Sequence, residues 1–170
     1  MAIFGIGANW DGIDKTGDFI HHNVAAIGWD QKDAPGLHQI MRHMKMGDII
    51  YLKSIYLPKK QLILKAIGII LDDEILETAN LQFLTGGNMG RNVGYIWEGS
   101  EDFTIPNDKE PVKSFTLYEE HNLVVKAVLF HLIFSRCNFI HKGNSEAFSK
   151  LVRTAESILS KERIQEEKPF

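Results

Sequence analysis

The sequence predicts an α+β fold in which short strands form one sheet or barrel and helices pack against it. Several apolar segments of strand length are separated by glycine-containing turns, the usual pattern of strands in a compact sheet. Two other segments, residues 37–44 and 144–159, carry apolar side chains at helical spacing. The chain has 170 residues, 44% of them hydrophobic and 24% charged, so we expect one domain over residues 1–160 and a charged tail at 161–170.

The first part of the chain supplies two strands and one helix. Residues 2–7 and 24–29 are short, apolar and bounded by turn residues, so both are expected to be strands. The Asp-Ala-Pro-Gly run at 33–36 is a helix-start signal for the segment 37–44. Four apolar side chains share one face of that helix: Leu37, Ile40, Met41 and Met44.

Two neighbouring antiparallel strands are expected next, at 49–54 and 62–70, joined by a loop at 57–60. The second strand is almost continuously apolar, which indicates that it crosses the core. Gly68 lies within it and permits a bend there.

The remainder of the chain is less regular. A glycine-rich loop at 85–92, which we interpret as an insertion at the rim, precedes a strand at 93–97. Residues 113–118 alternate as a strand does, and residues 123–134 are apolar on nearly all sides, which favours a buried helix. A final helix is expected to begin at Asn144.

Composition restricts the classes of function. The formal net charge is −3, from 19 Lys and Arg against 22 Asp and Glu, which argues against a broad basic surface for non-specific nucleic-acid binding and leaves room for a local one. The single cysteine, Cys137, is expected in the core and suits a reducing compartment. No signal peptide or membrane-length apolar run is visible. We therefore expect a cytoplasmic protein with no membrane partner.

Four short sequence motifs resemble those of a known family: GIGANW at 5–10, AIGW at 26–29, KMGDIIYLKS at 45–54 and AIGI at 66–69. Together they resemble the PUA-like superfamily and, within it, EVE domains, over about the first seventy positions. The resemblance implies a small, partly open mixed β-barrel with flanking helices. It also implies that the barrel mouth is a nucleobase pocket, as in EVE and YTH domains and the N-terminal modules of methylation-dependent restriction systems.

The three tryptophans, Trp10, Trp29 and Trp97, each lie at or just past an expected strand end, where a barrel mouth would be. Aromatic rings stack a flipped base for about 1–3 kcal/mol each, and amides or carboxylates read its edge. Asn9 and Asp30 flank two of the rings and are the predicted edge readers. The other predicted base-binding residues come from a third strand near the presumed mouth: Tyr51, Lys53 and Ser54. The alternative is that the tryptophans cap the core.

Phosphate contacts would come from the densest basic positions near the presumed mouth, although a solvated charged face also explains each of them. These positions are Arg42, His43, Lys45, Lys59, Lys60 and Arg91.

Metal chemistry finds little support in the sequence. His38 and His43 are five residues apart, which is not the spacing that puts two ligands on one helical face. These two histidines, and the adjacent pair His21 and His22, are more typical of surface or half-buried histidines. We therefore predict no metal site.

The sequence also gives little support for catalysis or cofactor binding. The glycine-rich run at 86–91 lacks the Gly-Lys-Ser/Thr ending of a phosphate loop and the Rossmann spacing, so no cofactor is predicted. Cys137 with His131 or His141 has no sequence context for an activated thiolate. The carboxylates at 72–74 and 119–120 are typical of solvated turns. No catalytic set assembles, and the chain is predicted not to be an enzyme.

The leading hypothesis is a non-catalytic module that recognises a modified or flipped nucleobase in DNA or RNA through an aromatic pocket, with any effector activity on a separate partner protein. The alternative is a module whose barrel mouth binds a peptide, a nucleotide or a small metabolite, as the acidic balance allows. A third hypothesis, from the same resemblance, is an enzyme that acts on a nucleotide or RNA.

Overall fold

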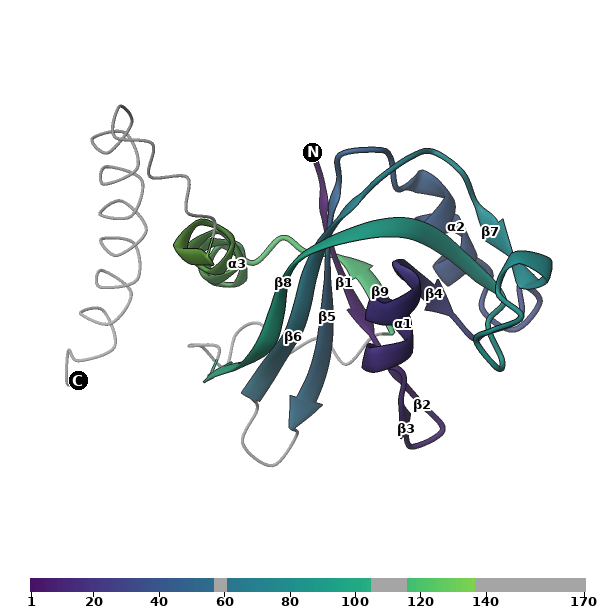
Figure 1. Cartoon of the computed structure of the whole chain (residues 1–170), viewed down its shortest axis with the longest axis horizontal. Helices are drawn as coiled ribbons and strands as arrows, with labels where there is room; N and C mark the ends of the chain where they lie inside the picture. The colour runs from purple at the N-terminus through teal and green to yellow at the C-terminus, as the bar shows by residue number, and fades with distance from the viewer. Residues whose placement is uncertain (57–60, 105–115, 137–170) are drawn as a thin grey trace, which may run out of the picture.

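The structure is a computed structural model that describes residues 1–56, 61–104 and 116–136 (Figure 1). Its strands are β1 (Ile3–Gly7), β2 (Asn9–Trp10), β3 (Ile13–Asp14), β4 (Val24–Ile27), β5 (Ile49–Tyr56), β6 (Gln61–Ile70), β7 (Leu76–Glu77), β8 (Met89–Thr104) and β9 (Leu117–Glu119). Its helices are α1 (Thr16–His22), α2 (Pro35–His43) and α3 (Leu123–Arg136), with a short 3-10 helix, η2 (Thr78–Asn80). This mixture confirms the predicted α+β class.

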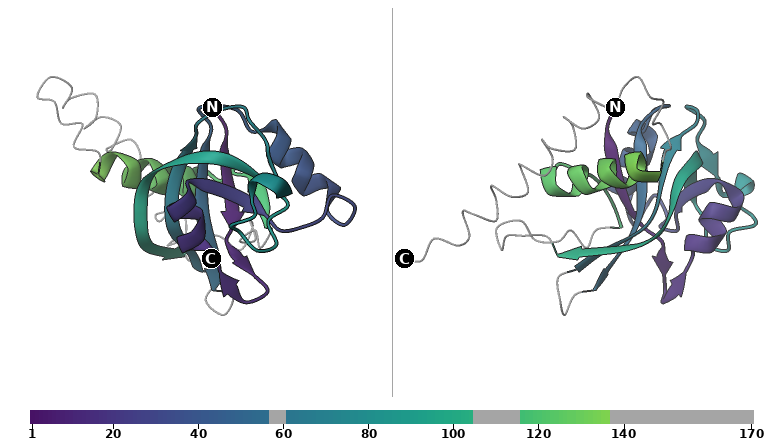
Figure 2. Two further views of the ribbon diagram at one scale, coloured as in Figure 1. Left: turned by 45° about the vertical axis from the view of Figure 1, so that its right-hand side comes forward. Right: turned by 60° about the vertical axis from the view of Figure 1, so that its left-hand side comes forward.

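Within the described residues, seven strands form one mixed sheet in the order β4-β8-β6-β5-β1-β9, with β7 beside β8, while β2 and β3 form a small ribbon. The β1–β5 pair is parallel, and the other pairs are antiparallel, including the predicted β5–β6 pair. Strand β8 arches over the other strands from one side of the molecule to the other (Figures 1 and 2). The sheet is therefore a curled half-barrel, in agreement with the predicted partly open barrel.

The curl is built into the β6–β8 pair. Its register shifts twice, between Leu64 and Ala66 and between Ile67 and Gly68, and such bulges bend a strand and increase its twist. At Gly68 an added Cβ atom would lie 2.3 Å from Cγ1 of Val93, so no other residue fits without a shift of the neighbouring strand. The predicted bend at Gly68 is confirmed.

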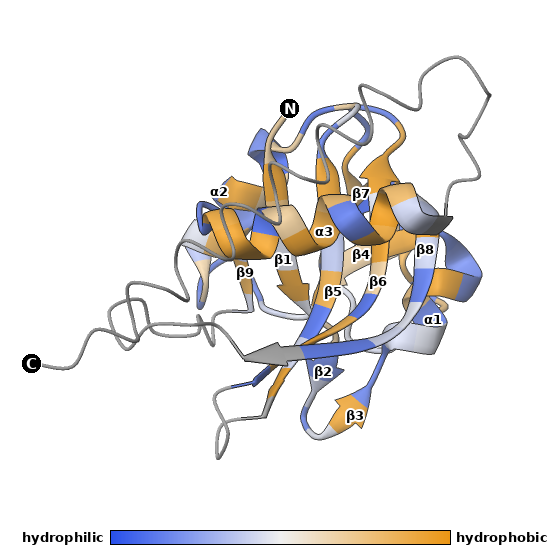
Figure 3. Cartoon of the chain, turned by 90° about the vertical axis from the view of Figure 1, so that its left-hand side faces the viewer, coloured by the Kyte–Doolittle hydropathy of each residue, from blue (hydrophilic) through white to orange (hydrophobic). Residues whose placement is uncertain are grey.

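The sheet buries both of its faces, because alternate side chains of a strand point to opposite sides. In β5, Ile50 and Leu52 join one cluster, whereas Ile49 and Tyr51 join the other. The inner core lies on the side of α1 and α2 and includes Phe4, Ile6, Phe19, Ala26, Ile27, Met41, Ile50 and Leu52. The outer core lies beneath α3, which crosses the strands in Figure 3, and comprises Ile3, Ile49, Tyr51, Leu62, Leu64, Ile67, Trp97, Val125, Leu129 and Leu132.

Three sequence predictions need correction. Strand β8 already begins at Met89, within the predicted loop, because Met89 to Asn92 pair with β4. It also continues to Thr104 instead of ending at Trp97, since it stays paired with β6 over that length. Helix α3 occupies the predicted position, but it is buried along one side only, and Leu123 is 67% exposed.

The strand predicted at 24–29 ends at Ile27, two residues early, and the other predictions agree with the structure or fall outside it. Helix α2 begins two residues earlier than predicted, at Pro35, a residue suited to the first turn because it has no N–H to leave unpaired. Strand β9 overlaps the predicted strand at 113–118. The loop at 57–60, Cys137, the final helix and the tail lie outside the described residues. No helix in the described part of the chain is long and apolar enough to cross a membrane.

Candidate functional site

The end of β4 is held in a tight backbone junction. Directly after the strand, Gly28 passes so close to its neighbours that an added Cβ atom would lie 3.0 Å from the carbonyl oxygen of Gly86 and 3.3 Å from the ring of Trp10. The loop before β8 is fixed to the same point by Asn88, whose backbone N–H donates to the carbonyl of Ile27 (2.9 Å) and whose side-chain amide donates to that of Gly28 (2.9 Å). The chain therefore leaves β4 along a defined path.

Trp29 is the next residue, and its side chain is 51% exposed. A buried histidine on α2 holds its backbone: Nε2 of His38 donates to the Trp29 carbonyl oxygen over 2.6 Å. A carbonyl only accepts, so the proton of a neutral imidazole lies on Nε2. Nδ1 of His38 is buried and has no hydrogen-bond partner among the described residues. Trp29 is thus an exposed aromatic ring on a fixed backbone.

Trp10 lies behind this junction. Its ring packs edge-on against Phe19 of α1, with centroids 5.6 Å apart and planes at 71°, and against Gly28. Its indole Nε1 is buried and makes no hydrogen bond within the described part of the chain. Buried donors are nearly always paired, so an orphan at a glycine-lined junction is a feature expected of functional sites. The structure brings Trp10 to the backbone that carries Trp29.

The two predicted edge readers are exposed neighbours of these rings. Asn9 Oδ1 accepts a hydrogen bond from the backbone N–H of Gly12 (3.1 Å), which braces the β2–β3 turn. The Asp30 carbonyl accepts from the backbone N–H groups of Asp33 (3.1 Å) and Ala34 (3.0 Å) in the turn that leads to α2. Each side chain thus projects from a turn whose backbone is hydrogen-bonded.

Trp97 does not join this group. It is 5% exposed and lies in the outer core with Val125 and Leu129 of α3. The reason is that β8 does not end at Trp97, where Ile67 of β6 is its partner. The prediction that Trp97 forms a wall of the same pocket as Trp10 and Trp29 is therefore wrong for this conformation.

Tyr51 and Lys53 also belong to the other side of the sheet, where they join a buried polar cluster. The Tyr51 hydroxyl donates to Glu120 Oε2 (2.6 Å) and lies 2.7 Å from the Tyr118 hydroxyl, and the Lys53 ammonium lies 5.1 Å from the centre of the Tyr118 ring. All four residues are buried. Their contacts connect β5 with β9 and with Glu120, the residue after β9. They are not placed to touch a base at Trp29.

Burial also perturbs the acid–base behaviour of this cluster. Burial lowers the pKa of Lys53 to about 8, and the nearby Glu120 carboxylate acts in the opposite direction. Burial, together with Tyr118 and Glu120, raises the pKa of Tyr51 well above its usual value. Ser54, the third residue predicted with them, is half-buried on β5 opposite Ile63.

The predicted phosphate-binding residues separate in the same way. Arg42 is exposed at the end of α2, and its guanidinium donates to the side chain of Gln31 (3.0 Å), two residues after Trp29. His43 and Lys45 are exposed nearby, whereas Lys59 and Lys60 lie outside the described residues. Arg91 is 1% exposed and donates to the Asp72 carbonyl (2.9 Å). Its burial excludes the predicted phosphate contact.

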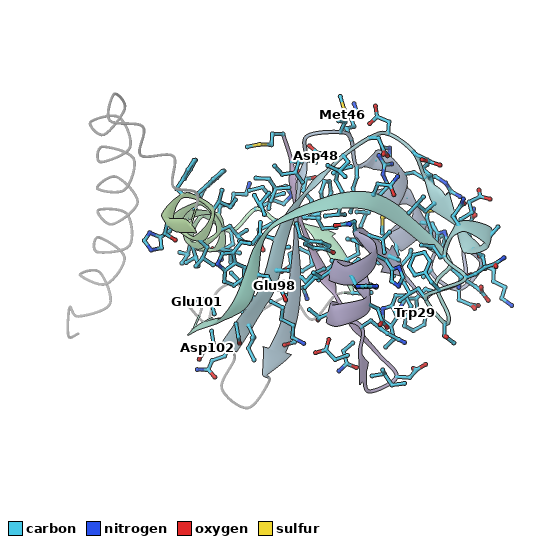
Figure 4. The ribbon with its side chains drawn as sticks, in the orientation of Figure 1. Trp29, Met46, Asp48, Glu98, Glu101 and Asp102 are labelled. Atoms are coloured by element: carbon cyan, nitrogen blue, oxygen red, sulfur yellow. The ribbon has the colours of Figure 1, made fainter. Side chains whose placement is uncertain are left out.

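Acidic side chains also gather along the end of β8. Glu98, Glu101 and Asp102 are exposed on the last part of β8, far from Trp29 in Figure 4. Carboxylates repel phosphate, so that end is unsuited to nucleic acid. In the described part of the chain, no group of three or more His, Cys, Asp or Glu residues is arranged to hold a metal ion.

His38 is the site residue that sequence reasoning missed. The sequence predicts a surface or half-buried histidine at this position, yet His38 is only 3% exposed. A signal was present, because His38 lies three residues before Met41 and thus on the apolar face of the helix. The sequence held no sign that its partner would be the Trp29 carbonyl.

Comparisons with known proteins support the fold. No protein-family model matches the sequence. The curated proteins give no match either. Among solved structures, the fold is similar to the YTH domain of the Zygosaccharomyces rouxii MRB1 protein, determined in complex with N6-methyladenosine RNA, with a TM-score of 0.52, 15% sequence identity, and coverage of 78% of this chain and 87% of that one. This likeness shows a YTH-like fold, consistent with the predicted PUA-like resemblance.

Proposed function

We propose that the chain is a non-catalytic module that binds a modified or flipped nucleobase of DNA or RNA, with the Trp29 indole as its stacking surface. The observation that carries the proposal is that Trp29 is 51% exposed while its backbone is fixed by His38 and by the packing of Gly28. A large ring held in this way loses little entropy when a base stacks on it. The fold likeness to a domain solved with methylated RNA supports the same reading.

The neighbouring residues have roles that follow from their chemistry. Asn9 and Asp30 supply an amide and a carboxylate for the edge of the base, next to Trp10 and Trp29. Trp10 forms the wall behind Gly28. Arg42, whose guanidinium donates to Gln31 two residues after Trp29, is the cation proposed to meet a phosphate next to the base, and Lys45 is proposed for a phosphate farther along the strand.

The test is a titration of tryptophan fluorescence with short DNA and RNA oligonucleotides, single- and double-stranded, with and without methylated bases, at two salt concentrations. We expect quenching that is stronger for one modified base and weaker at high salt. Trp29→Ala should weaken binding about 5- to 100-fold, since one stacked base contributes about 1–3 kcal/mol, and Trp29→Phe should retain most of the affinity. Leu123→Ala, at another exposed apolar side chain (67%) and on α3 at the other side of the sheet, is the matched control.

Unchanged affinity in a folded Trp29→Ala protein would refute the proposal. Binding of a peptide or metabolite that is insensitive to salt would instead favour a small-ligand module.

His38 offers a second test of the same site, because it acts on Trp29 only through the backbone. His38→Gln keeps an N–H donor for the Trp29 carbonyl, whereas His38→Leu leaves that carbonyl without it. We expect His38→Leu to weaken oligonucleotide binding several-fold more than His38→Gln does, at matched thermal stability. Equal binding by the two variants would show that the His38 hydrogen bond does not position Trp29 for binding.

A further inference from the structure

Three aromatic rings stack on the surface where α1 ends and the loop before β8 passes. The ring of His22 lies against that of Phe83, with centroids 4.0 Å apart and planes at 25°. The ring of His21 meets His22 edge-on, with centroids 4.7 Å apart. All three residues are exposed, and Phe83 keeps 43% of its surface although His22 covers one face of its ring. Neither the fold nor the site at Trp29 explains this stack.

Phe83 is held outward by its own loop. Leu81 and Leu84, on either side, are each 1% exposed. One turn fixes the backbone between them, since the Leu84 N–H donates to the Leu81 carbonyl, and a second turn follows directly, since the Gly87 N–H donates to the Leu84 carbonyl, both over 2.8 Å. A phenylalanine between two buried anchors has a fixed position and little freedom left to lose on binding.

The same loop connects the stack to the site at Trp29. The Gly86 carbonyl lies at the Gly28 junction, 3.0 Å from the position of an added Cβ. Gly86 is three positions after Phe83, so their Cα atoms are at most about 11 Å apart. Proteins that bind single strands stack successive bases on aromatic side chains along such a path.

We propose that Phe83, backed by His22, is a second stacking subsite that takes a base neighbouring the one at Trp29 in a single-stranded nucleic acid. The imidazole N–H groups of His21 and His22 are donors suited to the phosphate between the two bases. This inference rests on the proposed function and adds to it a preference for a strand over a free nucleotide.

The test compares two probes, free N6-methyladenosine and a short single-stranded RNA that carries one N6-methyladenosine. Phe83→Ala should weaken binding of the RNA about 5- to 100-fold, the usual effect of losing one stacked base, and leave nucleoside binding within about twofold, because the nucleoside lacks the neighbouring base. Phe83→Leu, which is apolar but has no ring, should also lose RNA affinity. Met46→Ala is the matched control, since Met46 is 66% exposed and lies away from Trp29 in Figure 4.

Three results overturn the second subsite: unchanged RNA binding in Phe83→Ala, an equal loss for both probes, or failure of the wild-type protein to bind the RNA. Trp29→Ala separates this failure from that of the proposed function, since it should lose affinity for nucleoside and RNA alike. Normal binding by Phe83→Ala beside impaired binding by Trp29→Ala would refute the second subsite alone.

Discussion

Trp29 and Trp97 have the same side chain and looked alike in the sequence, yet they lie in two different regions of the molecule. Trp29 lies two residues past the end of β4 and is 51% exposed, whereas Trp97 is 5% exposed beneath α3. The difference comes from the strands. Strand β4 ends at Ile27 against a glycine junction, but β8 continues to Thr104 in pairing with β6. In this molecule Trp29 is available to a ligand because the backbone leaves the sheet before it, whereas Trp97 stays within a paired strand under a helix.

The largest expected effect is on the free energy of unfolding, when each of the two tryptophans is replaced by alanine. Trp97→Ala should lower the free energy of unfolding by about 3–5 kcal/mol, because it empties the space between the sheet and α3. Trp29→Ala should change it by less than about 1 kcal/mol, because half of that side chain is already in water. Urea unfolding of the two variants measures both values. Similar losses in the two variants would contradict the assignment of these residues to different roles.

A second contrast concerns pH and the buried cluster on the outer side. Lys53 loses its proton near pH 8 in the folded protein but near 10.5 in the unfolded chain. Between these values the unfolded state binds more protons, so this residue makes stability rise with pH, at most by about 1.4 kcal/mol per pH unit. Above about pH 10 the effect reverses, because burial raises the pKa of Tyr51 and Tyr118 and the unfolded tyrosines lose their protons first.

Unfolding in urea across pH 7 to 10 measures this slope. Lys53→Met should remove it, while Lys65→Met, on the half-exposed Lys65 that pairs with Asp14 (2.6 Å), serves as the control. If the rise of unfolding free energy with pH persisted in Lys53→Met, groups other than Lys53 would cause it.

The sequence predicted most of the fold because strands and helices leave local periodic signals. The strands at β1, β4, β5 and β6 and the helices α2 and α3 were all anticipated near their observed positions. The length of β8 was not, since Gly90 and Gly99, on either side of the predicted strand at 93–97, resemble turn residues. Both glycines instead lie in close contacts, because an added Cβ would lie 2.8 Å from the Ala25 carbonyl oxygen at Gly90 and 2.8 Å from the Trp97 ring at Gly99.

The candidate site was predicted less well, because which face a side chain occupies depends on partners distant in sequence. Tyr51 and Lys53 follow the strand pattern correctly but face α3 and β9, and that choice is set by pairing with β1 and β6. Arg91 was expected at the surface as a cation in a glycine-rich loop, but the early start of β8 turns it inward to Asp72. Trp10 and Trp29 do lie at or just past strand ends, as their neighbouring turn residues indicated.

The smallest expected effect separates the two arginines. Arg42 is exposed beside Gln31 and Arg91 is buried, so only Arg42 is placed to displace a counterion from nucleic acid. Arg42→Ala should reduce the slope of log affinity against log salt by about 0.7 to 0.9, the contribution of one phosphate contact, with little change in stability. Arg91→Met should leave that slope unchanged and lower stability by about 1–3 kcal/mol, because the Asp72 carbonyl loses its donor. Binding isotherms at several salt concentrations and urea unfolding measure both. If Arg91→Met altered the salt slope in a folded protein, the guanidinium would have to reach the ligand, and its burial in the unbound chain would be a state that binding opens.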